Sequence, residues 1–261
     1  MRIAPLLATA FLAAAGLAGA QVINIDFDKA GSIVSYQGLA AASDPSGATA
    51  IWNSVTAAGS SIAAVNLLDS DGQTTGVGLS LGIDGSFLST PGEQELGAAS
   101  QFAGLMGDYV YLSSPTTTDI VTKAGTITGL DAGKLYDVYL YGQGDKFSEI
   151  LYSEGQNTLF TLNGIAKQTS WDGIAGGNGV LTEGVEYVKY SVNADVNGEI
   201  AFIWQNVVSG PGGNVTVDTD GANSRFAAIN GIQIVDVAAV PEPGAALLGA
   251  AGLLLLVRRR R

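Results

Sequence analysis

The sequence predicts an all-β protein whose main part is a single β-sandwich or jelly roll, flanked by an N-terminal signal peptide and a C-terminal hydrophobic helix. Short segments in which apolar and polar residues alternate recur along the chain, which is typical of half-buried strands. Clusters of Gly, Asn, Asp and Ser, the residues that favour turns, separate these segments. Residues 21–239 suit one large β domain, because all-β sandwiches often reach this length.

The first 20 residues have the parts of a secretory signal peptide in the usual order. A short positive start, Met1-Arg2, precedes an almost wholly apolar run over residues 3–17. Ala18 and Ala20 then place small residues at the positions that signal peptidase requires. We therefore predict cleavage between Ala20 and Gln21 and export of the remaining chain, with a buried N-terminal helix as the alternative.

Ten segments of residues 21–239 are predicted to be strands. The first reads VINIDFD, in which apolar and polar residues roughly alternate. Turn-forming clusters at 69–72, 176–179 and 211–214 punctuate the later segments. Apolar residues at helical spacing within 95–106 predict one or two helical turns. We expect two packed antiparallel sheets and helix in less than about a quarter of the body. The predicted strands are residues 22–28, 63–68, 76–83, 119–127, 135–141, 158–163, 185–192, 199–205, 215–217 and 226–235.

Composition excludes several classes of function. Residues 21–239 hold seven Lys and Arg against 23 Asp and Glu, a charge of −16. A body this acidic argues against nucleic-acid binding, which needs a basic surface. The chain has no Cys and no His, so catalytic triads with His and zinc sites with His or Cys ligands are absent. No pair of carboxylates with the signature of a glycosidase is recognisable, and we expect no enzyme.

The predicted strand at 135–141 carries the main candidate ligand contacts. Side chains alternate between the two faces of a strand, so Asp137, Tyr139 and Tyr141 share one face. Tyrosine rings beside a carboxylate are suited to sugars, which stack on the rings and donate hydroxyl hydrogen bonds to the carboxylate. The alternative is that both rings pack under a neighbouring loop. Trp52 and Trp171 stand beside loop residues and are further candidates, whereas Trp204 is expected in the core.

A calcium site is a second candidate. Two Asp-x-Asp-Gly loops, 69–72 and 218–221, lack the glutamate that an EF-hand needs at its twelfth position, so ordinary turns explain them. Asp26 and Asp28 at the end of the first strand are the candidate ligands, and Ca²⁺ is the only cofactor that we consider. If an ion is bound, chelation is expected to lower the melting temperature.

The C-terminal residues read VPEPGAALLGAAGLLLLVRRRR. The apolar run at 244–257 measures about 21 Å as a helix, whereas a bilayer core is about 30 Å thick. Pro241 and Pro243 disfavour a longer helix, and the arginines at 258–261 would stay in the cytoplasm. This arrangement favours transient insertion into a membrane, and a lasting C-terminal anchor is the alternative.

The sequence Val240-Pro241-Glu242-Pro243, followed by an apolar run and a basic end, resembles the PEP-CTERM sorting signal of Gram-negative bacteria. The resemblance covers the last 22 residues. It implies that exosortase, a membrane protease, cuts near the Pro-Glu-Pro motif and passes the protein to the cell surface or extracellular matrix. Residues 22–28, 130–142 and 228–234 are similar to the opening, central and closing strands of galactose-binding-like jelly-roll domains, which implies a carbohydrate-binding or adhesive role.

We therefore expect an exported surface or matrix protein that binds extracellular polysaccharide without catalysis. The expected partners also include signal peptidase and an exosortase-type protease. A structural or adhesive matrix protein without a specific ligand is the alternative.

Overall fold

The computed structural model describes residues 21–29, 36–42, 51–57, 59–88, 102–144, 156–170, 180–216 and 225–237. Residues Ala20–Val240 form one compact unit. The described residues contain fifteen strands and one helix of four residues, α1 (Ala103–Met106). The predicted all-β class is therefore confirmed. The predicted signal peptide with Ala20, the tail from Val240, the loop at 218–221 and Trp171 lie outside the described residues.

One sheet has five strands in the order β12-β8-β15-β1-β2. All neighbouring pairs are antiparallel except β1 and β2, which are parallel. The expectation of purely antiparallel sheets is wrong at this edge, since β1 and β2 run parallel. Parallel neighbours need a crossover connection rather than a hairpin. The strands are β1 (Val22–Asp28), β2 (Trp52–Thr56), β8 (Leu135–Tyr141), β12 (Tyr187–Asn193) and β15 (Gly231–Asp236).

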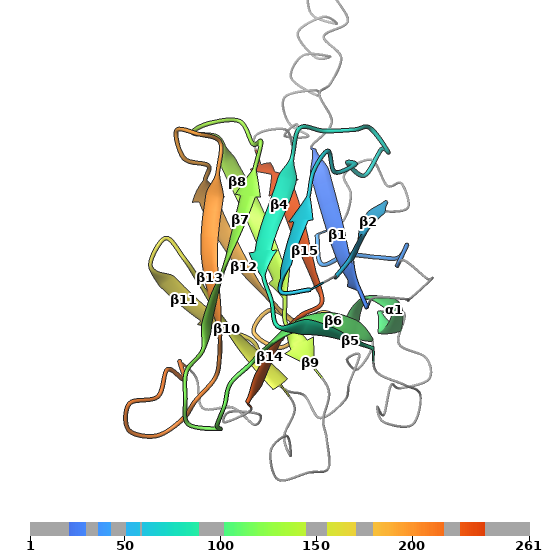
Figure 1. Ribbon diagram of the computed structural model, residues 1–261. Helices are drawn as coiled ribbons and strands as arrows, with labels where there is room; N and C mark the ends of the chain where they lie inside the picture. The colour runs from blue at the N-terminus through green and yellow to red at the C-terminus, as the bar shows by residue number, and fades with distance from the viewer. Residues whose placement is uncertain are drawn as a thin grey trace, which may run out of the picture. The chain divides into compact units, whose positions relative to one another are not determined.

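A seven-stranded sheet packs against the five-stranded sheet, and Figure 1 shows β4, β7 and β13 in front of β8, β12 and β15. Its main path is β11-β10-β13-β7-β4-β3, with β9 also paired to β10. A three-stranded sheet in the order β14-β6-β5 completes the fold. These strands are β3 (Ser61–Ala64), β4 (Gly78–Gly82), β5 (Gly85–Leu88), β6 (Asp108–Ser113), β7 (Thr122–Thr128), β9 (Gln143–Gly144), β10 (Gln156–Leu162), β11 (Ile165–Gln168), β13 (Ile200–Asn206) and β14 (Phe226–Ile229).

The main core lies between the two larger sheets. Each contributes alternate side chains, such as Phe27 and Val138 from one and Phe202 and Trp204 from the other. Trp204 is completely buried, as predicted. Burial of a large apolar side chain contributes about 1.5–3 kcal/mol, so a core of this kind stabilises residues 21–239, which contain no cysteine, without disulfides.

Several strands differ from the prediction. β1 and β8 have the predicted bounds, whereas β2, β5, β6, β9 and β11 were not predicted. Val215 and Thr216 lie in no strand. The predicted strand 226–235 is two strands in different sheets, β14 and β15, which meet at Asn230. The helical turns predicted in 95–106 correspond to α1 in the part that the structure describes.

Candidate functional site

The two faces of β8 have the predicted residues. Tyr136, Val138 and Leu140 point into the main core. Tyr139 and Tyr141 lie on the opposite face of the five-stranded sheet, in a second apolar cluster with Trp52 and residues of α1. Residues 36–42 contact this outer face, since Ala41 N donates a hydrogen bond of 2.8 Å to the Tyr141 hydroxyl.

Trp52, which we expected a ligand to reach, and Tyr141, a candidate glycan contact, are both buried. Tyr141 is 0% exposed and Trp52 is 3% exposed. The Trp52 indole donates to Gly38 O at 3.0 Å and packs edge-on against Tyr36, with ring centroids 5.2 Å apart. These rings pack beneath the segment 36–42, which is the alternative that the sequence left open. The local pattern of a strand does not say which distant segment covers its outer face.

Asp137 and Tyr139 lie beside β12, the edge strand of the sheet. Tyr139 pairs with Lys189 and Asp137 pairs with Ser191 in the register of β8 and β12. The Asp137 carboxylate forms an ion pair of 2.7 Å with Lys189 Nζ and accepts a hydrogen bond from the Ser191 hydroxyl. Lys189 Nζ also lies 5.3 Å from the centre of the Tyr139 ring. The hydrogen bond with Asp137 raises the pKa of Lys189, so its charge is retained.

An open groove with a volume of about 370 Å³ lies nearby, where β11 faces β12. These two strands are the edges of the two larger sheets. Asn163 and Gly164, with φ of 49° and 74°, form the turn that folds β11 back on β10 and so position one wall of the groove. The lining residues are Ala166, Lys167, Gln168, Glu183, Gly184, Val188 and Thr216.

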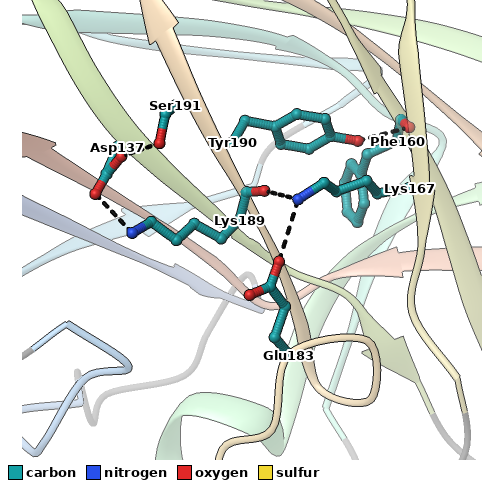
Figure 2. A network of polar contacts seen from close by, with 7 residues as sticks. All are labelled: Asp137, Phe160, Lys167, Glu183, Lys189, Tyr190 and Ser191. Atoms are coloured by element: carbon teal, nitrogen blue, oxygen red, sulfur yellow. Dashed lines mark hydrogen bonds and ion pairs between the residues drawn. The ribbon is translucent and has the colours of Figure 1, made fainter.

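Lys167 connects the groove to the rest of the edge (Figure 2). Its ammonium forms an ion pair of 3.2 Å with Glu183 and donates a hydrogen bond to Lys189 O. The same ammonium lies 5.2 Å from the centre of the Tyr190 ring, and the Tyr190 hydroxyl donates to Phe160 O at 2.9 Å. Lys189 therefore contacts both groups of residues: its backbone carbonyl accepts a hydrogen bond from Lys167, and its ammonium forms the ion pair with Asp137.

The groove offers donors and acceptors together. Lys167 donates, Glu183 accepts, and the exposed Thr216 hydroxyl can do both, whereas Gln168 is buried and its side-chain oxygen accepts from Thr216 N at 3.1 Å. The Lys167 and Glu183 side chains are 39% and 48% exposed, so a ligand can reach them. Such a surface matches a ligand whose many hydroxyl groups also donate and accept.

Asp26 and Asp28 lie elsewhere, on β1 beside Asp108 of β6. The three residues are 0%, 2% and 3% exposed. Burial raises the pKa of Asp26 to about 8, against a hydrogen bond from Tyr36 N that lowers it, and Asp108 and Asp28 raise it further. Burial and the nearby Asp28 raise the pKa of Asp108 to about 7. Sequence reasoning missed Asp108, because nothing local links it to β1.

The loop at 69–72 is an ordinary turn, as predicted. One Asp69 side-chain oxygen accepts hydrogen bonds from Asp71 N at 3.0 Å and Gln73 N at 2.8 Å. Gly72 takes a positive φ of 78°, which glycine adopts without a steric penalty. The Asp69 carboxylate therefore accepts hydrogen bonds from the backbone of its own turn.

No protein-family model and no curated protein sequence matches the chain. Among solved structures, the extracellular domain of ANXUR1 from Arabidopsis thaliana is 13% identical, with a TM-score of 0.41 over 85% of this chain and 51% of that one. The plant receptor-like kinase ANX2 is 11% identical, with a TM-score of 0.34 and coverages of 68% and 54%.

A structure of TmCBM61 in complex with beta-1,4-galactotriose is 14% identical, with a TM-score of 0.21 over 49% of this chain and 70% of that one. The chain spans about half the length of the two plant proteins. Because all three TM-scores lie below 0.5, these likenesses say nothing about the ligand of this chain.

No helix in the described part of the chain is both long enough and apolar enough to span a membrane.

Proposed function

We propose that the chain is an exported protein that binds extracellular polysaccharide without catalysis, through the groove between β11 and β12. The observation that carries this proposal is the mixture of exposed donors and acceptors in a groove of about 370 Å³, within the usual range of ligand sites of about 300–1,000 Å³. Sugar hydroxyls can exchange hydrogen bonds with both members of the Lys167–Glu183 pair.

The acidic residues that line the groove favour glycan binding over glycan hydrolysis. Most glycosidases place two carboxyl groups on either side of the bond that they cut. Among the described residues that line the groove, Glu183 is the single acid, and Lys167 neutralises it at 3.2 Å. A paired carboxylate can accept hydroxyl hydrogen bonds but is poorly suited to protonate a leaving group.

Asp137 and Tyr139 are proposed as a second contact along the same edge. The Asp137–Lys189 pair remains partly exposed, with side-chain exposures of 16% and 34%. Tyr139 is only 8% exposed, so it supports Lys189 more than it offers a stacking surface. An extended chain of sugars that follows β12 would contact both places. Trp171 remains a sequence prediction.

Glu183→Gln is expected to weaken glycan binding at least tenfold. The change keeps the shape of the side chain but removes the charge of an acceptor, and hydrogen bonds to charged groups contribute about 1.5–3 kcal/mol. A glycan array would identify a ligand for the purified protein, and calorimetry would then compare the affinities of the variants.

Glu199→Gln is the matched control, because Glu199 does not line the groove. Equal affinities of the wild type and Glu183→Gln for the array hit would contradict the placement of the site. Absence of binding to any glycan would favour the structural or adhesive matrix role.

We also propose that residues 240–261 are a processing signal. Prolines on both sides of Glu242 disfavour a helix at that position, and the apolar run is short for stable residence in a bilayer. Mature protein outside the cell is expected to lack arginines 258–261, and Glu242→Ala is expected to leave full-length protein in the membrane fraction. Intact-mass measurement tests this, and released protein that retains the arginines would favour a tail that is not cleaved.

A further inference from the structure

Three aspartates from two sheets lie close together, and one of them, Asp26, contacts the segment 36–42 through Tyr36 N. Asp26 and Asp28 point to the same face of β1, and Asp108 begins β6 of the three-stranded sheet. All three are at least 97% buried. The first strand and β6 are about 80 residues apart in the chain, so the tertiary structure alone brings the carboxyl groups together.

Each carboxyl group accepts a hydrogen bond through one oxygen, and the Asp28 and Asp108 side chains also lie within hydrogen-bonding reach of each other. Asp26 Oδ2 accepts from Tyr36 N at 2.8 Å, Asp108 Oδ2 accepts from Lys29 N at 3.4 Å, and Asp28 Oδ2 accepts from the Ser54 hydroxyl. The Oδ1 atoms of all three are buried and form no hydrogen bond. Most buried polar atoms in proteins have a partner, so three such oxygens in one cluster require an explanation.

Within the described part of the chain, no Lys or Arg side chain forms an ion pair with Asp26, Asp28 or Asp108. The ion pairs among the described residues involve other acids: Asp84, Asp131, Asp137, Glu183 and Asp236. Buried carboxylates without a counter-charge are costly. The charge must therefore be removed by protons or balanced by a cation.

We propose that Asp28 and Asp108, with Asp26 beside them, bind a divalent cation of the Ca²⁺ type. Calcium is coordinated by carboxylate oxygens together with hydroxyl and backbone oxygens, and the Ser54 hydroxyl already lies against Asp28. Among the described residues, no three Asp, Glu, His or Cys side chains are grouped as a ready metal site. In the proposed site, the carboxylates of Asp28 and Asp108 provide most of the negative charge. Uncharged oxygens, such as the Ser54 hydroxyl, complete the coordination shell of the cation.

The cation has a structural role that is independent of the groove. It joins β1 of the five-stranded sheet to β6 of the three-stranded sheet, in a protein without disulfides. A ligand that binds the folded state stabilises it by mass action. This site uses the candidates Asp26 and Asp28 from the sequence and adds Asp108, which the sequence did not indicate.

Terbium(III) luminescence tests the proposal directly on the full chain. Tb³⁺ replaces Ca²⁺ at oxygen sites and emits when nearby aromatic rings are excited, and Tyr36 donates its backbone N–H to Asp26 while packing against Trp52. After dialysis against chelator, saturable emission that Ca²⁺ displaces is expected. Added Ca²⁺ is also expected to raise the melting temperature in proportion to the logarithm of its concentration above the Kd.

Asp28→Asn and Asp108→Asn are expected to weaken Tb³⁺ binding at least tenfold. Asp69→Asn is the matched control, since Asp69 belongs to the Asp-x-Asp-Gly turn, and its affinity is expected to stay unchanged. Near-ultraviolet circular dichroism checks folding, and Asp108→Glu replaces any variant that does not fold, with weaker binding again expected. No saturable emission in the wild type, or binding lost in Asp69→Asn alone, would overturn the proposal and leave protons as the neutralising species.

Discussion

Asn230→Ala is expected to lower the free energy of unfolding by about 3–5 kcal/mol, because three buried backbone groups lose the side chain that they bond to. Each unsatisfied group costs about 1–3 kcal/mol, and the three costs are not fully additive because the groups share one side chain. The Asn230 amide nitrogen donates to Met106 O at 3.1 Å and Asp108 O at 3.2 Å, and its oxygen accepts from Gln143 N at 2.8 Å. Asn230 is 0% exposed, so water cannot replace these bonds. Urea unfolding followed by tryptophan fluorescence measures the change.

Asn193→Ala is the control for this prediction. The Asn193 amide also donates to a backbone oxygen, Gly133 O at 2.8 Å, but on an exposed surface. Its loss is expected to cost less than about 1 kcal/mol, since water takes the place of the side chain. Similar losses in the two variants would show that Asn230 does not act as the link between β14, β6 and β9.

In chelator, the free energy of unfolding is expected to fall by a few kcal/mol as the pH rises from about 5 to 8, given about 1.4 kcal/mol per pKa unit. The folded-state pKa values of Asp26, about 8, and Asp108, about 7, exceed the ordinary value of 3.8. In this window the unfolded chain has released the protons that the folded protein retains. Stability therefore decreases as the pH rises through the folded-state values.

Asp26→Asn is expected to flatten this dependence and to raise stability at pH 8, because the amide keeps an acceptor for Tyr36 N without a charge. Thermal melts at a series of pH values measure both effects. Asp84→Asn, at a surface ion pair of 2.7 Å with Lys123, is expected to leave the slope between pH 5 and 8 unchanged. A wild-type melting temperature that rises over this window would contradict the prediction.

The groove illustrates a signal that the sequence contains but that the predicted strands did not use. Asn-Gly between two apolar segments is a strong indication of a hairpin, and Asn163-Gly164 forms that turn between β10 and β11. With the hairpin recognised, Lys167 would have been placed on a strand. Its partners could not have been found in this way, because Lys189 lies on β12 of the other sheet and Glu183 lies just before that strand.

The sequence by itself determined the all-β class, the two faces of β8 and the burial of Trp204, and its lack of His and Cys excluded whole classes of chemistry. These features are local, because alternation with a period of two follows from the geometry of each strand. Only the tertiary structure decided that residues 36–42 cover Trp52 and Tyr141, and that Asp108 joins Asp26 and Asp28. Many segments of similar composition could cover the same face, and the choice among them depends on the packing of the whole core rather than on any local pattern.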